Sequence, residues 1–360
     1  MTNKYMSFTL SSQAYSKSQL VSFCNSKLPT LPFNSSEYHL YRFIQDFISE
    51  NPVIAVKTSG STGKPKEIEL SKDAMIKSAK LTGQFLNLKR GDRALLCLPV
   101  DFIAGKMMVV RAFVLGLDLI PVPPALNPLK EIDKTFSFAA MTPMQVHNIL
   151  ECEGGYEKLN KIENLIIGGG DISKGLLQKI QKLKNKVFHS YGMTETITHV
   201  AMKHLNSSKP DKYFKALKMI SFDTDERGCL VITAPHICTE EIVTNDIVEL
   251  HGETSFEFKG RIDNTINTGG IKVFPEIIEK KLSGYINERF LIAAIPDENL
   301  GQKVVLIIES NKNEINKGVF SKANLLKYET PKDIFFLKKF NETGNGKIDR
   351  KGVVRKLINF

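Results

Sequence analysis

The chain has 360 residues, of which 42% are hydrophobic and 24% are charged, at ordinary globular proportions. This length allows two or three domains with a sizeable core, and the composition excludes a disordered, collagen-like or coiled-coil chain. Residues 1–10 are polar and lack the apolar run of a secretory signal, so we expect none. The most apolar stretch, 107–122, contains charged residues and is too short to span a bilayer.

The five cysteines are scattered and show no CxxC or Cys/His spacing. We therefore expect neither a disulfide framework nor a structural zinc site, and a cytoplasmic location fits best. The formal net charge of +10 comes mainly from lysines spread along the chain. We interpret it as a lysine-rich surface, with attraction for polyanionic small molecules as the alternative. Nucleic-acid binding is disfavoured, because aromatic residues are not interleaved with the lysines.

Short apolar runs alternate with longer amphipathic stretches between residues 51 and 191. The runs predict strands at 52–56, 94–98, 119–122, 165–167 and 187–188. Helices are expected at 73–86, with Ser71 as N-cap, and at 103–115, which is apolar on most faces and should be buried against a sheet. Strand–helix–strand alternation of this kind indicates parallel strands with crossover helices.

The pattern changes after Met202. Short alternating strands are predicted at 228–233, 241–243, 247–250 and 255–259, which indicates an antiparallel or barrel-like region. A helix at 275–282 and strands at 290–294, 304–309 and 334–337 predict a small α+β unit. The fold class is therefore α/β: a large N-terminal domain of parallel-rich βα sheets with a small barrel-like region, then a small C-terminal domain. The polar, glycine-rich loop at 260–270 is the expected boundary.

The most specific motif follows the first predicted strand and consists of Thr58, Ser59, Gly60, Ser61, Thr62, Gly63 and Lys64, then Pro65 and Lys66. Small residues let the backbone approach an anion closely, their amide and hydroxyl groups can surround phosphate oxygens, and the lysines add positive charge. The motif is not a Walker A loop, which requires a longer gap between the glycines and a Ser or Thr where Pro65 stands. A surface hairpin is the alternative.

Two further motifs follow predicted strands, where ligands of open α/β sheets gather. The segment 191–196 contains Glu195, which could hold a Mg²⁺ ion that bridges phosphates, and Thr194, which could donate to a phosphate. The segment 168–171, three glycines and an aspartate, would let a flat ligand lie against bare backbone. An ordinary loop and a capped strand-to-helix turn are the respective alternatives.

Three later segments also carry polar groups. Asp246 suits a ribose diol, because a carboxylate accepts both hydroxyl protons. The segment 260–276 lies at the expected domain boundary, and the glycine-rich segment 343–350 presents Lys347. A surface turn is the alternative for each of them, and for 343–350 taken alone it is the favoured interpretation.

Taken together and in this order, the motifs resemble those of the acyl-adenylate-forming superfamily, which contains acyl-CoA synthetases, luciferase-like enzymes and peptide-synthetase adenylation domains. The resemblance extends from about residue 53 to residue 350. It implies two steps: a carboxylate attacks the α-phosphate of ATP to give acyl-AMP and pyrophosphate, and a thiol, commonly that of CoA, then displaces AMP. It also implies Mg²⁺ as cofactor, with ATP and CoA as co-substrates.

The resemblance assigns a role to each motif. Loop 58–66 would bind the β- and γ-phosphates, Thr194 the α-phosphate and Glu195 the Mg²⁺ ion. The adenosine would be framed by Gly168, Gly169, Gly170, Asp171, Tyr191 and Gly192, with Asp246 and Arg261 on the ribose. Lys347 would bridge the carboxylate and the α-phosphate, where a cation between two anions stabilises the transition state.

The resemblance also implies a domain movement. Asp263 matches a hinge between an N-terminal AMP-binding domain (1–262) and a mobile C-terminal domain (264–360). Rotation between the half-reactions would withdraw Lys347 and bring Gly269, Gly270 and Lys272 to the incoming pantetheine.

The sequence departs from the family pattern in two ways. Only residues 1–57 precede the phosphate loop, so the chain resembles a compact member. Phe102 stands where many relatives carry histidine. Compactness and the segment 102–108 most resemble the short o-succinylbenzoate–CoA ligases of bacterial menaquinone synthesis.

The acid implied by this resemblance is a dianion, whose second carboxylate must be recognised. The candidate residues of the acyl pocket are Phe102, Lys106, Arg111, His189 and His199. Another aryl or small acyl acid, a carrier-protein thiol as acceptor, and a non-catalytic nucleotide-binding protein are the alternatives. No nucleic acid and no membrane insertion are expected, and a homo-oligomer is left open.

Overall fold

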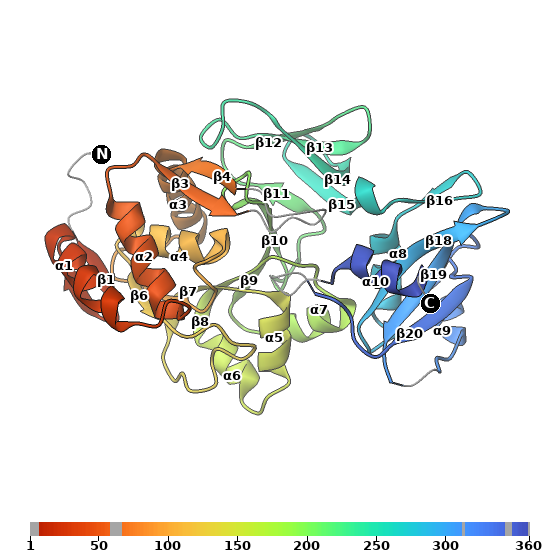
Figure 1. The fold of residues 1–360 in the computed structure, drawn as a ribbon, viewed down its shortest axis with the longest axis horizontal. Coiled ribbons are helices and arrows are strands. Elements are labelled where there is room, and N and C mark those ends of the chain that lie inside the picture. Colours follow the sequence, from red (N-terminus) through yellow and green to blue (C-terminus); the bar gives the residue numbers. More distant parts are fainter. Residues whose placement is uncertain (1–6, 58–66, 312–313, 343–347, 359–360) are drawn as a thin grey trace.

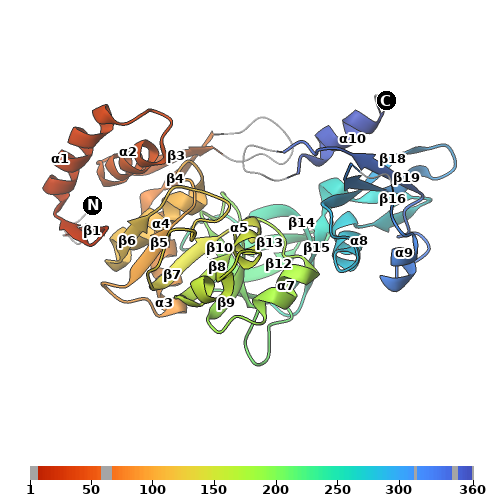
Figure 2. The same cartoon turned by 90° about the horizontal axis from the view of Figure 1, so that it is seen from below.

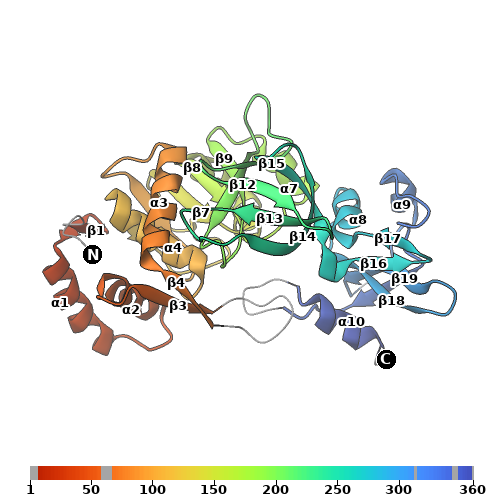
Figure 3. The ribbon, with the colours of Figure 1, turned by 90° about the horizontal axis from the view of Figure 1, so that it is seen from above.

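The structure, a computed structural model, describes residues 7–57, 67–311, 314–342 and 348–358 (Figure 1). Its larger part is built on one mixed sheet, whose strand order is β12-β13-β14-β15-β11-β10-β9-β8-β7-β5-β6-β1-β2. A smaller C-terminal domain has its own sheet and lies at one end of the molecule (Figures 2 and 3).

The parallel half of the large sheet confirms the predicted strand–helix alternation. Its parallel strands are β5 (Arg93–Leu96), β6 (Asp118–Pro121), β7 (Phe136–Met141), β8 (Ile162–Ile167) and β9 (Lys186–Gly192). The crossovers are α4 (Ile103–Leu115), α5 (Pro143–Leu150), α6 (Gly155–Asn160) and α7 (Lys174–Ile180). Strand β7 was not predicted. The edge is formed by β1 (Phe8–Leu10), parallel to β6, and β2 (Gln13–Tyr15), antiparallel to β1.

Helices cover both faces of this half (Figure 1). Ala94 and Leu96 belong to the core under α3 (Lys72–Leu86) and α4, whereas Leu95 belongs to a second core under α5, α6 and α7. This alternation follows from the two-residue period of a strand. The predicted bounds of α4 and the predicted N-cap of α3 are confirmed, since the hydroxyl of Ser71 accepts from the backbone of Ala74. No helix in the described part of the chain is both long and apolar enough to cross a membrane.

The region before the parallel sheet differs from the prediction. The run 52–56 is a strand, β3 (Val53–Lys57), but it pairs antiparallel with β4 (Glu67–Ser71) in a separate two-stranded sheet. Its apolar residues share a hydrophobic core with α1 (Lys17–Lys27) and α2 (Ser36–Ile48), two helices that the sequence did not predict. A short 3₁₀ turn (Leu28–Thr30) joins these helices.

The antiparallel half continues the same sheet. Its strands are β10 (His199–His204), β11 (Phe214–Ala216), β12 (Ser221–Thr224), β13 (Cys229–Thr233), β14 (Ile242–Leu250) and β15 (Ser255–Arg261). The predicted strands 241–243 and 247–250 are one strand, β14, with a register shift against β15 between Ile247 and Val248. The change from parallel to antiparallel pairing falls between β9 and β10.

The C-terminal domain begins after a 3₁₀ turn, η2 (Ile262–Asn264). Its strands are β16 (Ile266–Thr268), β17 (Ile271–Val273), β18 (Phe290–Asp297), β19 (Gly301–Glu309) and β20 (Asp333–Leu337), and its helices are α8 (Pro275–Leu282), α9 (Gly318–Lys322) and α10 (Arg350–Ile358). The predicted bounds of α8 are confirmed. Two hydrophobic clusters, one on each face of this sheet, share no residue with the clusters of the large domain.

The packing of α4 depends on one glycine. A Cβ atom at Gly105 would lie 2.2 Å from the carbonyl oxygen of Pro99, a backbone contact that no side chain can relieve. We expect Gly105→Ala to lower the free energy of unfolding by about 2–3 kcal/mol in urea titrations, because the helix must shift away from the end of β5. Gly175→Ala in α7 is the control, since a Cβ atom at Gly175 would meet nothing within 4 Å. Equal stability of both variants would contradict this account of α4.

Candidate functional site

Two of the predicted motifs, 168–171 and 191–196, meet at the carboxyl ends of β8 and β9, beside the point where the sheet changes from parallel to antiparallel. Ile167, the last residue of β8, is in register with His189 of β9. The glycine segment 168–171 and the segment 191–196 therefore leave the sheet side by side. Such switch points are where open α/β sheets bind ligands.

The glycine segment presents bare backbone and also forms the turn into α7. Gly169 has a φ of 82°, and a Cβ atom at Gly168 would lie 2.5 Å from the hydroxyl of Ser190. Ser173 caps α7 by accepting from the backbone of Leu176. The segment can therefore form a capped strand-to-helix turn and still offer its backbone to a flat ligand. Asp171 lies exposed at its end.

His189 is tied to this turn. Its Nε2 lies 3.1 Å from the carbonyl oxygen of Gly170, and because a carbonyl only accepts, Nε2 carries the proton. Burial lowers the pKa of His189, which favours the neutral ring. The ring also packs against Phe214, with centroids 5.1 Å apart.

Three residues expected around the nucleoside lie together. Strands β14 and β15 place Asp246 opposite Arg261. The Tyr191 hydroxyl donates to one oxygen of the Asp246 carboxylate at 2.5 Å, and Nη1 of Arg261 donates to the other at 3.1 Å. Burial and the neighbouring Asp246 carboxylate raise the pKa of Tyr191 well above its ordinary value, so Tyr191 remains a hydrogen-bond donor.

The segment after β9 forms a strained turn. Ile197 has a φ of 64°, a value that costs a β-branched residue about 1–3 kcal/mol. The hydroxyl of Thr196 accepts from the backbone of Met193 at 2.9 Å and lies 2.6 Å from the carbonyl oxygen of Thr198. These contacts hold the turn 193–198 closed.

Glu195 projects from this turn and is exposed. Within the described ranges, no hydrogen bond or ion pair engages its carboxylate. One free carboxylate beside a threonine suits Mg²⁺, which usually takes one or two carboxylates together with phosphate oxygens. The residues present therefore fit a magnesium ion held jointly with a phosphate chain.

Two of the predicted acyl-pocket residues join in a closed ring of hydrogen bonds. Arg111 donates from Nε to the Thr82 hydroxyl (3.2 Å) and from Nη2 to the Thr198 hydroxyl (2.9 Å). His199 bonds to both threonines, through Nε2 to Thr82 (2.9 Å) and through Nδ1 to Thr198 (3.1 Å). Since the Thr82 hydroxyl proton goes to the Ser78 carbonyl, Nε2 of His199 is the donor and Nδ1 accepts from Thr198.

The other acyl-pocket candidates lie elsewhere. Lys106 donates to the Val100 carbonyl at 2.8 Å and lies over the Phe43 ring, 4.8 Å from its centroid. Positions 106 and 111 are separated by about 140° around the helix, so Lys106 and Arg111 occupy different faces. Phe102 precedes α4 as its half-buried N-cap residue.

The hinge candidate lies where the two domains join. The Asp263 carboxylate accepts from Nη2 of Arg261 (2.8 Å) and from Nδ2 of Asn245 (3.4 Å). Gly269 and Gly270, with φ values of 58° and 81°, form the turn of the β16–β17 hairpin, and Lys272 is exposed on β17. This hairpin lies beyond α8 from β9 (Figures 1 and 3).

Several predicted residues lie outside the described residues. These are Thr58, Ser59, Gly60, Ser61, Thr62, Gly63 and Lys64 of the phosphate loop, and Lys347. Their assignments stay predictions.

Sequence reasoning missed Thr82 and Thr198, which complete the ring around Arg111. Thr82 is fully buried in the middle of α3 and bonds to a residue 117 positions away. No spacing in the sequence reveals such a contact, although a threonine within an apolar helix face is a weak signal.

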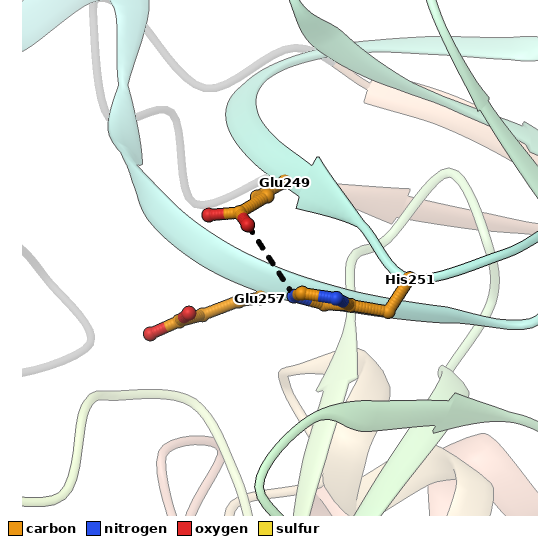
Figure 4. A group of neighbouring side chains, drawn as sticks. All are labelled: Glu249, His251 and Glu257. Atoms are coloured by element: carbon orange, nitrogen blue, oxygen red, sulfur yellow. Dashed lines mark ion pairs between the residues drawn. The ribbon is translucent and has the colours of Figure 1, made fainter.

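A further polar group consists of Glu249 on β14, His251 just after that strand and Glu257 on β15 (Figure 4). The Lys259 amine lies 2.7 Å from Glu249 and 3.0 Å from Glu257, so it already neutralises these carboxylates. The His251 ring stacks on Tyr213, with centroids 3.5 Å apart.

A large mixed sheet with a nucleotide-type site at its switch point, followed by a smaller C-terminal domain, is the architecture of AMP-forming ligases. The family profile described as "AMP-binding enzyme" matches residues 26–220. The chain belongs to this family of enzymes, which confirms the resemblance found in the sequence.

Individual relatives agree with this assignment. The 2-succinylbenzoate–CoA ligase of Listeria monocytogenes is 26% identical, over 81% of this chain and 68% of that protein. A solved structure from Dyadobacter fermentans, an acyl-CoA synthetase (AMP-forming)/AMP-acid ligase II-like protein, is 36% identical with a TM-score of 0.61, over 92% of this chain and 97% of that one. The O-succinylbenzoate coenzyme A synthetase of Bacillus subtilis, solved with ATP and magnesium ion, is 20% identical with a TM-score of 0.70, over 82% and 68%, and has the same fold.

The ring around Arg111 predicts a pH-dependent stability. Burial and the Arg111 charge lower the pKa of His199 well below 6.5, so below that pH the unfolded chain binds a proton that the folded chain excludes. Stability therefore falls as the pH drops below about 6.5, and His199 contributes up to about 1.4 kcal/mol per pH unit. Urea titrations between pH 7.5 and 5 measure this slope.

His199→Gln is expected to flatten the slope by up to that amount, and His147→Gln, at an exposed position of α5, is the control. An unchanged slope in His199→Gln would show that His199 is not held neutral.

Proposed function

We propose that this enzyme is an ATP-dependent acid–CoA ligase that acts through an acyl-adenylate. The acid proposed is o-succinylbenzoate, which with ATP and CoA would give o-succinylbenzoyl-CoA, AMP and pyrophosphate. The observation that carries the proposal is the meeting of the glycine segment, Tyr191, Asp246, Arg261 and the exposed Glu195 at one switch point.

In the first half-reaction the nucleotide would lie along this edge of the sheet. The adenine would rest on the backbone of 168–170 and on Tyr191, and the ribose diol would donate to Asp246. Thr194 would contact the α-phosphate. A magnesium ion at Glu195, when bound, neutralises charge on the phosphates. The acid's carboxylate oxygen attacks the α-phosphorus, and the bond from that phosphorus to pyrophosphate breaks.

Lys347 is proposed to lie between the two anions during this attack. Carboxylate and triphosphate repel each other, and a cation placed between them stabilises the charge that develops at phosphorus. Donation from loop 58–66 to the β- and γ-phosphates would stabilise the departing pyrophosphate in the same way.

In the second half-reaction the C-terminal domain is proposed to rotate about Asp263. The sulfur of CoA attacks the acyl carbonyl, a carbon–sulfur bond forms, and the bond to AMP breaks. The position of the β16–β17 hairpin, beyond α8 from β9, supports this movement, because Gly269, Gly270 and Lys272 would have to approach the edge of the sheet where the nucleotide is proposed to lie.

The choice of acid rests on the names of the Listeria and related enzymes. The second carboxylate needs a donor with capacity to spare. Arg111 and His199 are engaged in the ring, and the one proton of the neutral His189 ring goes to the Gly170 carbonyl. Lys106 has three N–H donors and, among the described residues, one hydrogen bond, to the Val100 carbonyl. This difference favours Lys106 as the partner of the second carboxylate, with Phe102 lining the pocket.

Pyrophosphate release tests the reaction. We expect release that requires o-succinylbenzoate and stops on addition of EDTA, and a lower rate with the analogue that lacks the ring carboxylate. If folded enzyme releases no pyrophosphate with o-succinylbenzoate, this acid is not the substrate. The rate of AMP release with CoA, compared with the rate with a holo-carrier protein, shows which thiol accepts the acyl group.

Lys347→Ala tests the mechanism. Loss of the bridging charge should slow acyl-AMP formation by about 10²–10³-fold, while thiolation of supplied acyl-AMP changes much less. Lys351→Ala, at an exposed position of α10, is the matched control. Equal damage to both half-reactions would contradict the assigned role.

A further inference from the structure

Arg111 is a buried cation without an acidic partner. It is 2% exposed in the middle of α4, and no carboxylate of the described residues lies within ion-pair distance. Its partners are neutral: Thr82, Thr198, the sulfur of Met108 at 3.8 Å and the Phe138 ring, 5.8 Å from Cζ. An apolar residue of similar volume would fill this position without the desolvation of a charge. The stability of the fold therefore does not account for the arginine.

The guanidinium is charged at neutral pH. Burial lowers the pKa of Arg111 only to about 9. The neutral His199 beside it adds no second charge, and the ring of hydrogen bonds uses both threonine hydroxyls. Both threonine hydroxyls and both ring nitrogens of His199 are engaged, and Arg111 is only 2% exposed, which disfavours direct contact between Arg111 and a substrate.

The ring is instead attached to the strained turn. Thr198 is the last residue of that turn, and its hydroxyl accepts from Nη2 of Arg111 at 2.9 Å. Its carbonyl accepts from the Thr196 hydroxyl, which in turn accepts from the backbone of Met193. Ile197, between them, has a φ of 64° and needs such support. Three residues span at most about 11 Å, so Glu195 is close to this anchor.

We propose that Arg111 is a positioning residue for adenylation: through Thr198 it holds the turn 193–198 in the conformation that presents Thr194 and Glu195 to the metal and the phosphates. The inference rests on the proposed function for the roles of Thr194 and Glu195. It adds a determinant of metal–nucleotide binding that is buried in α4, outside the motifs found in the sequence.

Calorimetric titration tests this role without turnover. Arg111→Met removes the donors at similar length, and Thr198→Val removes only the accepting hydroxyl. Both should weaken binding of Mg·ATP by about tenfold or more, the effect typical of residues that orient metal ligands, while binding of ATP in EDTA changes less. Arg111→Lys should bind Mg·ATP only slightly better than Arg111→Met, because an ammonium lacks the planar fork of donors of a guanidinium. The double variant Arg111→Met/Thr198→Val should lose no more affinity for Mg·ATP than either single variant, because both substitutions remove the same hydrogen bond.

Thr82→Val is the comparison variant. It breaks the ring on the α3 side and keeps the bond from Arg111 to Thr198, so its affinity for Mg·ATP should stay within about twofold of wild type. Should Arg111→Met fail to fold, Thr198→Val carries the test alone, with circular dichroism to confirm its fold.

Two results would overturn the proposal. Equal losses in Thr82→Val and Thr198→Val would show that the ring acts only on stability. A rise in KM for o-succinylbenzoate with unchanged affinity for Mg·ATP would show that Arg111 recognises the acid instead. The first result does not depend on the acid being correct: failure of wild type to release pyrophosphate would contradict the proposed function, while its Mg·ATP titration would still be measurable.

Discussion

Parallel pairing of β8 with β9, followed by antiparallel pairing of β9 with β10, is the constraint on which this site depends. Parallel strands end at the same edge of a sheet, so the two segments that leave β8 and β9 must emerge together. The reversal at β10 then turns the chain back beside them. The antiparallel strands β14 and β15 extend the same sheet and bring Asp246 and Arg261 to Tyr191. No long loop is needed to assemble these groups.

Charge is distributed unevenly around this edge. Asp246 is buried and engaged on both oxygens, whereas Glu195 is exposed and free of partners among the described residues. Arg111 stands behind the turn as a buried cation balanced only by neutral groups. A buried charge without a counterion is expensive, so the bonds from Arg111 to neutral groups are made at a cost to stability.

The sequence predicted those elements whose signals are local. The bounds of α4 and α8 and the cap of α3 follow from periodicity, prolines and Ser71, and all were confirmed. Strand β7, whose sequence FSFAAM lacks β-branched residues, gave no such signal and was missed. The prediction that the run 52–56 pairs within the parallel sheet was wrong, because an apolar run indicates a strand but not its neighbour. The contact of Thr82 with His199 spans 117 residues and depends on the packing of α3 against β10, which no motif encodes. The motifs thus indicated the edge of the sheet where the candidate site lies. The hydrogen bonds of Arg111 behind this edge could be found only in the folded structure.

The separation of the hydrophobic cores bears on how the enzyme could cycle. Because the small domain keeps its own apolar interior on both faces of its sheet, reorienting it would leave these two hydrophobic clusters intact. The contacts that would have to break include the ion pair of Lys280 with Glu257 and the hydrogen bond from the backbone of Lys174 to Ser283. The ion pair is screened by dissolved ions and is individually weak. The balance between the two arrangements of the enzyme would then be adjustable by ionic strength, with its fold left intact.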